Sequence, residues 1–227
     1  MLCFETQSQK TLAQLCQALA QENAALKLQL EQNFDLKERY VALENLTQIG
    51  QRYTYKKVFA HVIQRNVSAW FESLKLDKGK SHGVKENAIA VAYCGIVGKV
   101  TEVFEKFSTV TLTSSPKFRL AVCLENFRMP MIFLGNGYRY KRNSSGKYEL
   151  KASGSLKNIP IRAQPFLYKG ARIICSSLTS TAPEGLTLGH VESVYPSVDG
   201  MFLTADVILP QGLFDFYEVM ILLPDDL

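Results

Sequence analysis

The stretch Leu76–Asn87 reads LDKGKSHGVKEN and contains Gly79-Lys80-Ser81, a tripeptide that also ends the phosphate-binding loop of nucleotide hydrolases. Such a loop needs a glycine five residues before its Gly-Lys pair, and it opens a helix. Leu74 occupies that position here, and Gly83 and a further strand-like segment follow Ser81. The stretch therefore predicts a polar turn between two strands, and a nucleotide site is excluded.

After Gly50, apolar and polar residues tend to alternate with a period of two, and this pattern predicts an all-β body. Turn signals at 77–79, 114–116, 136–137, 143–146, 183–185 and 198–200 separate the short apolar segments. The predicted strands are 55–65, 88–93, 98–104, 109–112, 119–124, 131–134, 138–142, 147–152, 171–176, 188–193, 201–208 and 217–222. About a dozen strands in about 170 residues are typical of a sandwich or of barrels, and they favour two small barrels.

The first part of the chain has a different, helical pattern. From about Gln7 to Leu46 there is no proline or glycine, and strong helix formers dominate. Leucines recur at intervals of three, four and seven residues, which is the spacing of a coiled-coil seam. The polar residues Glu22, Gln29 and Asn33 occupy seam positions and interrupt it. We expect this helix to pair with a second copy or another chain; a helix lying on its own domain is the alternative. The predicted dimerisation residues are Leu12, Leu15, Leu19, Leu26, Leu36 and Leu43.

These two patterns predict a mainly β protein, in which a long N-terminal coiled-coil α-helix precedes two small six-stranded β-barrels. The expected domains are a coiled-coil helix at 1–50 and a β body at 51–227, with about 95–175 forming the second barrel. Residues 1–50 hold four Lys/Arg and six Asp/Glu, and the remaining residues hold 22 and 15, so the β body is mildly basic. No apolar run approaches the ~20 residues that cross a bilayer, and no signal peptide is visible.

The residues that could carry chemistry give little support to catalysis. None of the three histidines, His61, His82 and His190, accompanies the G-x-S-x-G turn of a hydrolase. Five cysteines without C-x-x-C spacing argue against zinc, and their odd number argues against a disulfide framework. Tyr138–Arg142 interleaves aromatic and basic residues as a nucleic-acid platform does, but one exposed hairpin strand explains it better. We therefore expect no cofactor, metal or nucleic acid.

The order of several motifs resembles the rod shape-determining protein MreC family, over essentially the whole chain. The helix leads into a strand, a tryptophan link and a turn similar to the family's idkGs.dGV. Further segments are similar to its GlvGkV stretch, its short G-x-G hairpin, its P-x-G-l-x-x-G-x-V stretch and its closing pair of strands. The segment 169–178 departs from the family, since it lacks an Asp and a second Gly. The matching segments are Val58–Arg65, Trp70, Leu76–Val84, Gly95–Val100, Met131–Gly137, Ala182–Val191 and Phe202–Leu223.

This resemblance implies two six-stranded barrels arranged as in chymotrypsin-type proteases, without the catalytic triad. It also implies a non-enzymatic periplasmic scaffold of the cell-elongation machinery, which maintains rod shape by dimerising and by organising or activating peptidoglycan synthases. The implied partners are a second copy or higher self-assembly, a class B penicillin-binding transpeptidase, MreD and, indirectly, MreB. An N-terminal span outside this chain would anchor the protein to the bacterial inner membrane. A divergent double-β-barrel serine hydrolase is the alternative.

Overall fold

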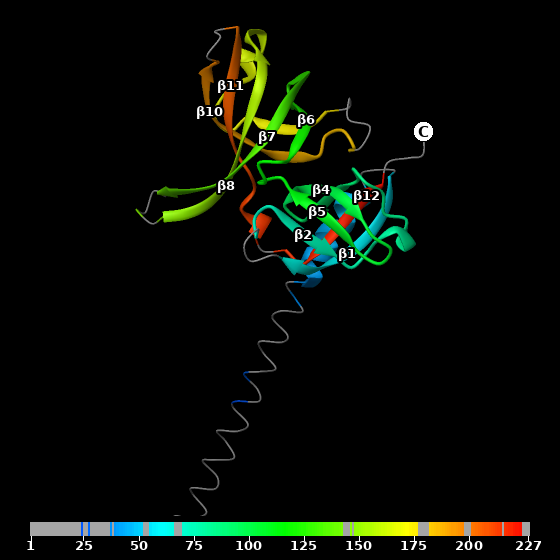
Figure 1. Cartoon of the computed structure of the whole chain (residues 1–227). Helices are drawn as coiled ribbons and strands as arrows, with labels where there is room; N and C mark the ends of the chain where they lie inside the picture. The colour runs from blue at the N-terminus through cyan, green and yellow to red at the C-terminus, as the bar shows by residue number, and fades with distance from the viewer. Residues whose placement is uncertain are drawn as a thin grey trace, which may run out of the picture. The chain divides into compact units, whose positions relative to one another are not determined.

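The structure, a computed structural model, describes residues 24, 27, 37, 39–51, 55–65, 70–142, 146, 148–176, 182–197, 201–214 and 216–223. The chain divides into two compact units, Met1–Glu44 and Asn45–Leu227. Within the described ranges, all twelve strands belong to the second unit, and only short 3-10 helices interrupt them. The protein is therefore mainly β, as its period of two predicts (Figure 1).

The strands close into two six-stranded barrels. The first has the order β1-β12-β3-β4-β5-β2, and the second has the order β10-β11-β8-β7-β6-β9. The first comprises β1 (Lys56–Arg65), β2 (Ser73–Leu76), β3 (Ile89–Ala92), β4 (Gly95–Val103), β5 (Ser108–Leu112) and β12 (Glu218–Leu223). The second comprises β6 (Arg119–Leu124), β7 (Phe127–Arg142), β8 (Tyr148–Pro160), β9 (Arg172–Cys175), β10 (Thr187–Pro196) and β11 (Phe202–Ile208).

This strand order corrects the expected range of the second barrel, about 95–175. β4 and β5 close the first barrel, whereas β10 and β11 belong to the second. β12 returns from the far end of the chain and pairs on one side with β1 and on the other with β3. A barrel closes only when its last open edge finds a partner, and here that partner lies more than a hundred residues away in sequence. Local patterns do not reveal such a pairing.

Two local predictions also need correction. The turn expected at Asn136–Gly137 is a bulge inside β7, where the register with β8 shifts between Gly135 and Tyr138. Gly137 has φ +74°, a left-handed conformation that occurs in both turns and bulges. An Asn-Gly dipeptide is therefore compatible with either structure. The second difference is β2, a strand that the sequence pattern does not predict because four residues are too few to show a period.

The stretch Leu76–Asn87 forms a turn, as predicted. Lys80–His82 form a short 3-10 helix (η2), and Gly83 follows with φ +79°. The amides of Lys80 and Ser81 donate to the carbonyls of Phe104 and Glu105, at 2.8 and 3.1 Å. These donors are therefore taken by the β4–β5 connection, and they do not form a phosphate cradle.

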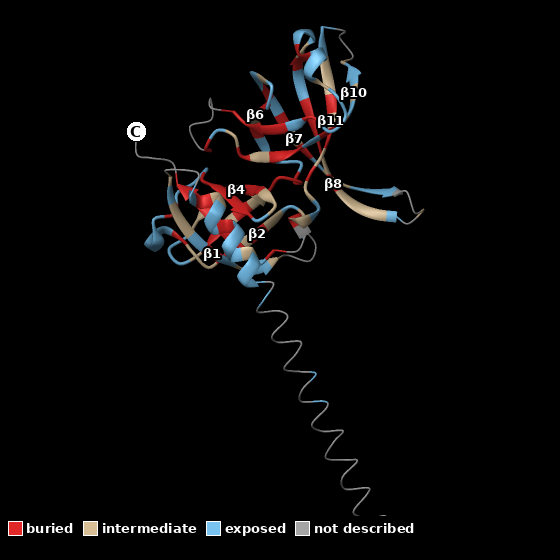
Figure 2. Ribbon diagram, turned by 180° about the vertical axis from the view of Figure 1, so that it is seen from behind, coloured by how far each residue is buried: buried red, intermediate tan, exposed pale blue. Residues whose placement is uncertain are grey.

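Both barrels are filled by aliphatic side chains, and Figure 2 shows the buried residues running through them. All six residues of β12 are buried, which means that both of its faces are covered. The end of the helix formed by residues 39–51 lies close to this strand. Leu46 is fully buried there, and a Cβ placed on Gly50 would lie 3.1 Å from Met220 Sδ. The last helical turn is thus part of the body's core.

Candidate functional site

The helix changes from exposed to buried within one turn as it reaches the β body. Leu43 is 40% exposed, whereas Leu46 is 0% exposed and joins the hydrophobic core. Tyr40 and Val41 are also exposed. Leu43 is the one predicted dimerisation residue within the described part of the chain; Leu12, Leu15, Leu19, Leu26 and Leu36 lie outside it. The helix thus has an exposed apolar side chain one turn before the fully buried Leu46.

A small polar and aromatic cluster connects the two barrels. Tyr138 of β7 donates its phenol hydrogen to Ser114 Oγ at 3.1 Å, and Ser114 Oγ donates to the Phe71 carbonyl at 2.7 Å. The rings of Phe71 and Tyr138 lie with their centroids 3.8 Å apart. Phe71 immediately precedes β2 in the first barrel, so this junction holds the second barrel to the first.

A cation-π contact lies in the same region. The Arg65 guanidinium lies 5.5 Å from the ring centroid of Trp70 and 4.6 Å from that of Phe216. Its Nη2 also donates to the Phe216 carbonyl at 3.3 Å. Burial raises the pKa of Tyr138 to about 12, while its hydrogen bond with Ser114 and the charge of Arg65 act in the opposite direction. The junction therefore stabilises the neutral phenol.

Replacing this phenol is expected to change how stability depends on pH. A raised pKa in the folded state means that wild-type stability is complete below pH ~10 and is lost as the pH rises toward ~12. Tyr138→Phe removes that loss, and it costs about 1 kcal/mol at neutral pH because Ser114 loses a partner. Urea unfolding at about pH 8 and about pH 11 measures both effects. Tyr140→Phe is the matched control, since Tyr140 is exposed on the same strand; an equal response of both variants would contradict the prediction.

The strands β7 and β8 continue beyond their neighbours in the second barrel. β6 pairs with β7 only as far as Leu134, and β11 pairs with β8 only from Ser153. Beyond these points residues 138–142 pair with residues 148–152, and we call this two-stranded ribbon the arm. Figures 1 and 2 show the arm projecting from the second barrel. The hairpin interpretation of Tyr138–Arg142 is confirmed.

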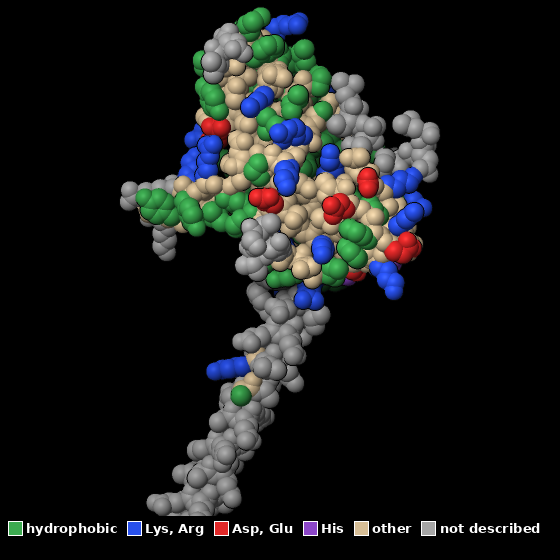
Figure 3. Space-filling view, viewed as in Figure 1, with side chains coloured by type: hydrophobic (Ala, Val, Ile, Leu, Met, Phe, Trp, Pro, Cys, Tyr) green, Lys and Arg blue, Asp and Glu red, His purple; other side chains and the backbone are tan. Residues whose placement is uncertain are grey.

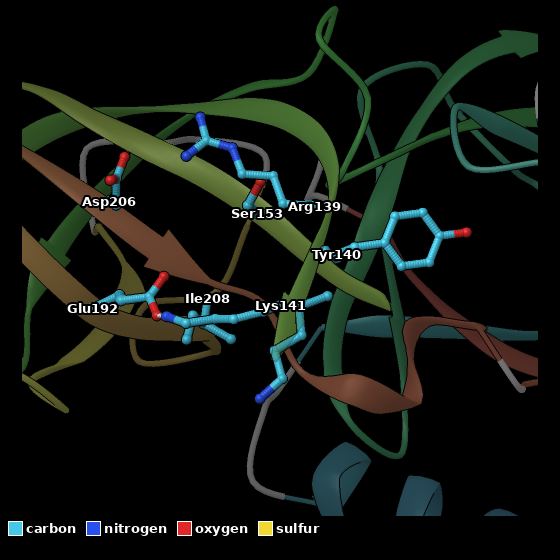
Figure 4. A pocket seen from close by; sticks show the side chains of 9 residues that line it. Arg139, Tyr140, Lys141, Ser153, Glu192, Asp206 and Ile208 are labelled. Carbon is cyan, nitrogen blue, oxygen red and sulfur yellow. Dashed lines mark ion pairs between the residues drawn. The ribbon is translucent and has the colours of Figure 1, made fainter. Parts of the chain in front are cut away.

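A hollow of about 200 Å³ lies between the arm and strands β10 and β11. Figure 4 shows Lys141 of the arm meeting Glu192 of β10 in an ion pair. Asp206 of β11 accepts hydrogen bonds from Ser193 Oγ and from the Tyr195 hydroxyl, each at 3.2 Å. Burial, followed by the charge of Asp206 and its hydrogen bond, raises the pKa of Tyr195. The Lys141–Glu192 ion pair links the arm to the barrel, and both carboxylates of the hollow have partners.

Hydrophobic side chains gather at the end of the second barrel where β8 leaves it and β11 enters. Figure 3 shows them at the top of the molecule, and others along the arm. Phe202 pairs with Pro160, the residue that precedes the 3-10 helix η3 (Ile161–Phe166). The exposed apolar residues here, which we call the end patch, are Ile161, Phe166, Met201 and Phe202. Exposed apolar groups clustered in this way mark sites of protein or membrane contact.

The contacts of the histidines and cysteines do not assemble a catalytic centre within the described residues. His61 Nδ1 lies 3.9 Å from Glu218 Oε1, and His82 Nδ1 lies 3.1 Å from Ser81 Oγ, but neither histidine contacts both a serine hydroxyl and a carboxylate. Across the same residues no group of three His, Cys, Asp or Glu side chains could hold a metal ion. Burial raises the pKa of the Cys94 thiol to about 12, which suppresses thiolate chemistry.

The described helical residues contain no segment long and apolar enough to cross a membrane. Together the geometry defines a class of protein: a pair of six-stranded barrels that is joined to a helix end and exposes apolar surface. The family described as "Rod shape-determining protein MreC, barrel core" matches residues 62–223. The chain therefore belongs to the MreC family of cell shape-determining proteins.

Individual relatives agree with this assignment. The chain is 29% identical over 205 residues to the cell shape-determining protein MreC of Listeria monocytogenes, covering 90% of this chain and 63% of that protein. A solved structure of the Listeria monocytogenes MreC superimposes with a TM-score of 0.63 at 26% identity, over 90% and 97% of the two chains. Another MreC structure has a TM-score of 0.68 at 19% identity, over 82% and 98%, and shows the fold alone. The chain thus spans 63% of the length of its curated Listeria relative.

Proposed function

We propose that this chain is part of a non-enzymatic periplasmic scaffold, which maintains rod cell shape by organising or activating peptidoglycan synthases. The observation that carries this proposal is the match of the MreC barrel core to residues 62–223, which include strands of both barrels. A double barrel in which polar contacts hold one barrel to the other, and which also exposes a set of apolar side chains, is suited to binding partners. The scaffold would be anchored to the inner membrane through a span outside this chain.

The helix is proposed to dimerise through Leu12, Leu15, Leu19, Leu26, Leu36 and Leu43. The exposure of Leu43, one turn before the buried Leu46, supports a seam that faces a partner. Because an isolated apolar seam is costly in water, pairing it with a second copy stabilises the helix. Two β bodies would then be held at a set distance from each other and from the membrane.

The other proposed partners are a class B penicillin-binding transpeptidase, MreD and, indirectly, MreB. The end patch is the surface that we assign to the transpeptidase, since its exposed side chains include two aromatic residues, Phe166 and Phe202. Aromatic side chains are enriched where protein interfaces concentrate binding energy. Binding there would shift the transpeptidase toward an active arrangement without any chemistry by the scaffold.

The dimer prediction is tested by truncating two seam leucines. Leu19→Ala/Leu26→Ala is expected to leave the β body folded and to abolish the helix-mediated dimer in sedimentation experiments, because each truncation removes apolar area from both sides of the seam. Leu28→Ala is the control, since Leu28 lies off the predicted seam. A double variant that dimerises as strongly as wild type would contradict the helix as the seam.

The same two chains serve as bait on detergent-solubilised bacterial membranes. Wild type is expected to retain a penicillin-binding transpeptidase, and the double variant to retain less because it presents one β body instead of two. Recovery of no peptidoglycan synthase by either bait would contradict the scaffold proposal. Stoichiometric labelling of a serine by a fluorophosphonate probe would instead favour the hydrolase alternative.

A further inference from the structure

The hollow beside the arm is lined by several charged side chains, and only some of them neutralise one another. Lys141 is paired with Glu192, and Lys151 also has a carboxylate partner. Arg139 and Asp206 take part in no ion pair with the residues that the structure describes. The hydrogen bonds that Asp206 accepts come from uncharged hydroxyl groups, so they leave its negative charge in place.

These two remaining charges come from different parts of the second barrel. Arg139 belongs to the part of β7 that forms the arm, and Asp206 belongs to β11. Figure 4 shows the guanidinium and the carboxylate standing apart, while the Lys141–Glu192 ion pair lies lower in the view. The structure thus holds two opposite charges at one hollow without joining them.

Both charges act on the hydroxyl group of Tyr195, which lies 3.2 Å from Asp206 Oδ1. Burial is the main cause that raises the pKa of Tyr195; the charge of Asp206 adds to the rise, and the charge of Arg139 opposes it. Arg139 and Asp206 are therefore near enough to the same point for one small ligand to reach both.

The chemistry of the two groups defines what such a ligand must offer. A guanidinium binds a carboxylate through parallel N–H donors, and a carboxylate accepts hydrogen bonds from an ammonium group. Asp206 is half-buried, so water screens its charge less than it would at a fully exposed position. A ligand with a single charge would leave one of the two protein charges without a partner.

We propose that the hollow binds a small zwitterion, an amino acid or a short peptide, with its carboxylate on Arg139 and its ammonium on Asp206. The hollow measures about 200 Å³, which is below the roughly 300–1,000 Å³ of pockets for drug-sized molecules. Ala152 and Ile208 also line it and suit a short aliphatic side chain. Size and lining therefore favour a ligand no larger than a dipeptide of small residues.

A bound zwitterion would also connect the arm to the barrel. Because Arg139 belongs to the arm and Asp206 to β11, the ligand adds a link beside the ion pair of Lys141 with Glu192. The alternative is a direct contact, in which the Arg139 side chain rotates to Asp206 and fills the hollow itself. The site shares no residue with the end patch or the helix seam, so it does not depend on the proposed scaffold function.

The test is a titration of the full chain with alanylalanine, followed by the NMR shifts of the amides around the hollow. Two related probes isolate the charges: N-acetylalanylalanine lacks the ammonium group, and alanylalanine amide lacks the carboxylate. Each is expected to bind about tenfold more weakly than alanylalanine, because each loses a hydrogen bond between charged groups.

Two variants remove the matching protein charges. Arg139→Gln and Asp206→Asn should each weaken alanylalanine binding about tenfold. Arg139→Gln should also bind alanylalanine amide as well as alanylalanine, and Asp206→Asn should do the same for the N-acetyl probe. Lys157→Gln is the control, since it removes a charge from an exposed residue of β8 that does not line the hollow.

Circular dichroism checks that each variant keeps its β structure, and Arg139 is exposed, so its replacement should not disturb the fold. Amide shifts that stay unchanged when alanylalanine is added to wild type would overturn the proposal and favour the direct contact of Arg139 with Asp206. Equal binding of the three probes would also overturn it, because the hollow would then not distinguish the charges. The same holds if Arg139→Gln binds alanylalanine as tightly as wild type does.

Discussion

Replacing Gly135 by alanine is expected to cost the protein about 3 kcal/mol of unfolding free energy. A Cβ at this position would lie 2.2 Å from the Ser115 carbonyl oxygen and 2.5 Å from that of Thr113. Both obstacles are backbone atoms of the link between β5 and β6, which crosses from the first barrel to the second. Neither can rotate away as a side chain does. The substitution must therefore displace the link at the barrel junction, where Ser114 contacts Tyr138.

The matched control lies two residues further along the same strand. Gly137 has φ +74° and no atom within 4 Å of its built Cβ, so Gly137→Ala introduces backbone strain without a collision. Its expected cost is about 1 kcal/mol. Denaturant unfolding followed by the fluorescence of Trp70, the single tryptophan, measures both variants. Equal costs for the two substitutions would show that the close approach at Gly135 does not exist.

Leu46→Ala is expected to lower the stability of the β body by about 3 kcal/mol. Leu46 is fully buried in the core, although it belongs to the helix and not to a barrel strand. Its removal leaves a cavity in this core, one helical turn before Gly50, which lies close to Met220 of β12. The helix end and the barrel therefore unfold together in wild type, and the variant should show a lower transition midpoint by calorimetry.

Leu43→Ala provides the contrast one turn earlier. Leu43 is 40% exposed, so its truncation should change the stability of the β body by less than about 0.5 kcal/mol. The same variant should weaken dimerisation in sedimentation experiments, since Leu43 belongs to the predicted seam. If Leu46→Ala leaves the unfolding free energy unchanged, the helix end does not contribute to the core.

Several features of this fold could be predicted from local sequence alone. The period of two predicts the strands after Gly50, and for β6 the predicted bounds, Arg119 to Leu124, are the observed ones. The stretch Leu76–Asn87 lacks the first glycine of a phosphate-binding loop and is followed by a strand-like segment, so the sequence predicts a turn. Lys80–His82 form only a short 3-10 helix there. In both cases the deciding interactions lie within a few residues, so the pattern contains the information.

Of the candidate interaction surfaces, the sequence predicts only the leucine seam, and of its six leucines Leu43 alone lies within the described residues. The end patch could not be predicted, because Ile161 and Phe202 are far apart in the chain and meet only through the pairing of Phe202 with Pro160.

The amino-acid sequence by itself determined the alternation that makes strands, the glycines that permit turns and the break between helical and β patterns near Gly50. Only the tertiary structure decided which strands share a barrel, that β12 closes the first one between β1 and β3, and that Asn136–Gly137 is a bulge within a single long strand. The reason is physical: side-chain alternation is a property of neighbouring residues, whereas barrel closure depends on hydrogen bonds between segments that the chain brings together only on folding.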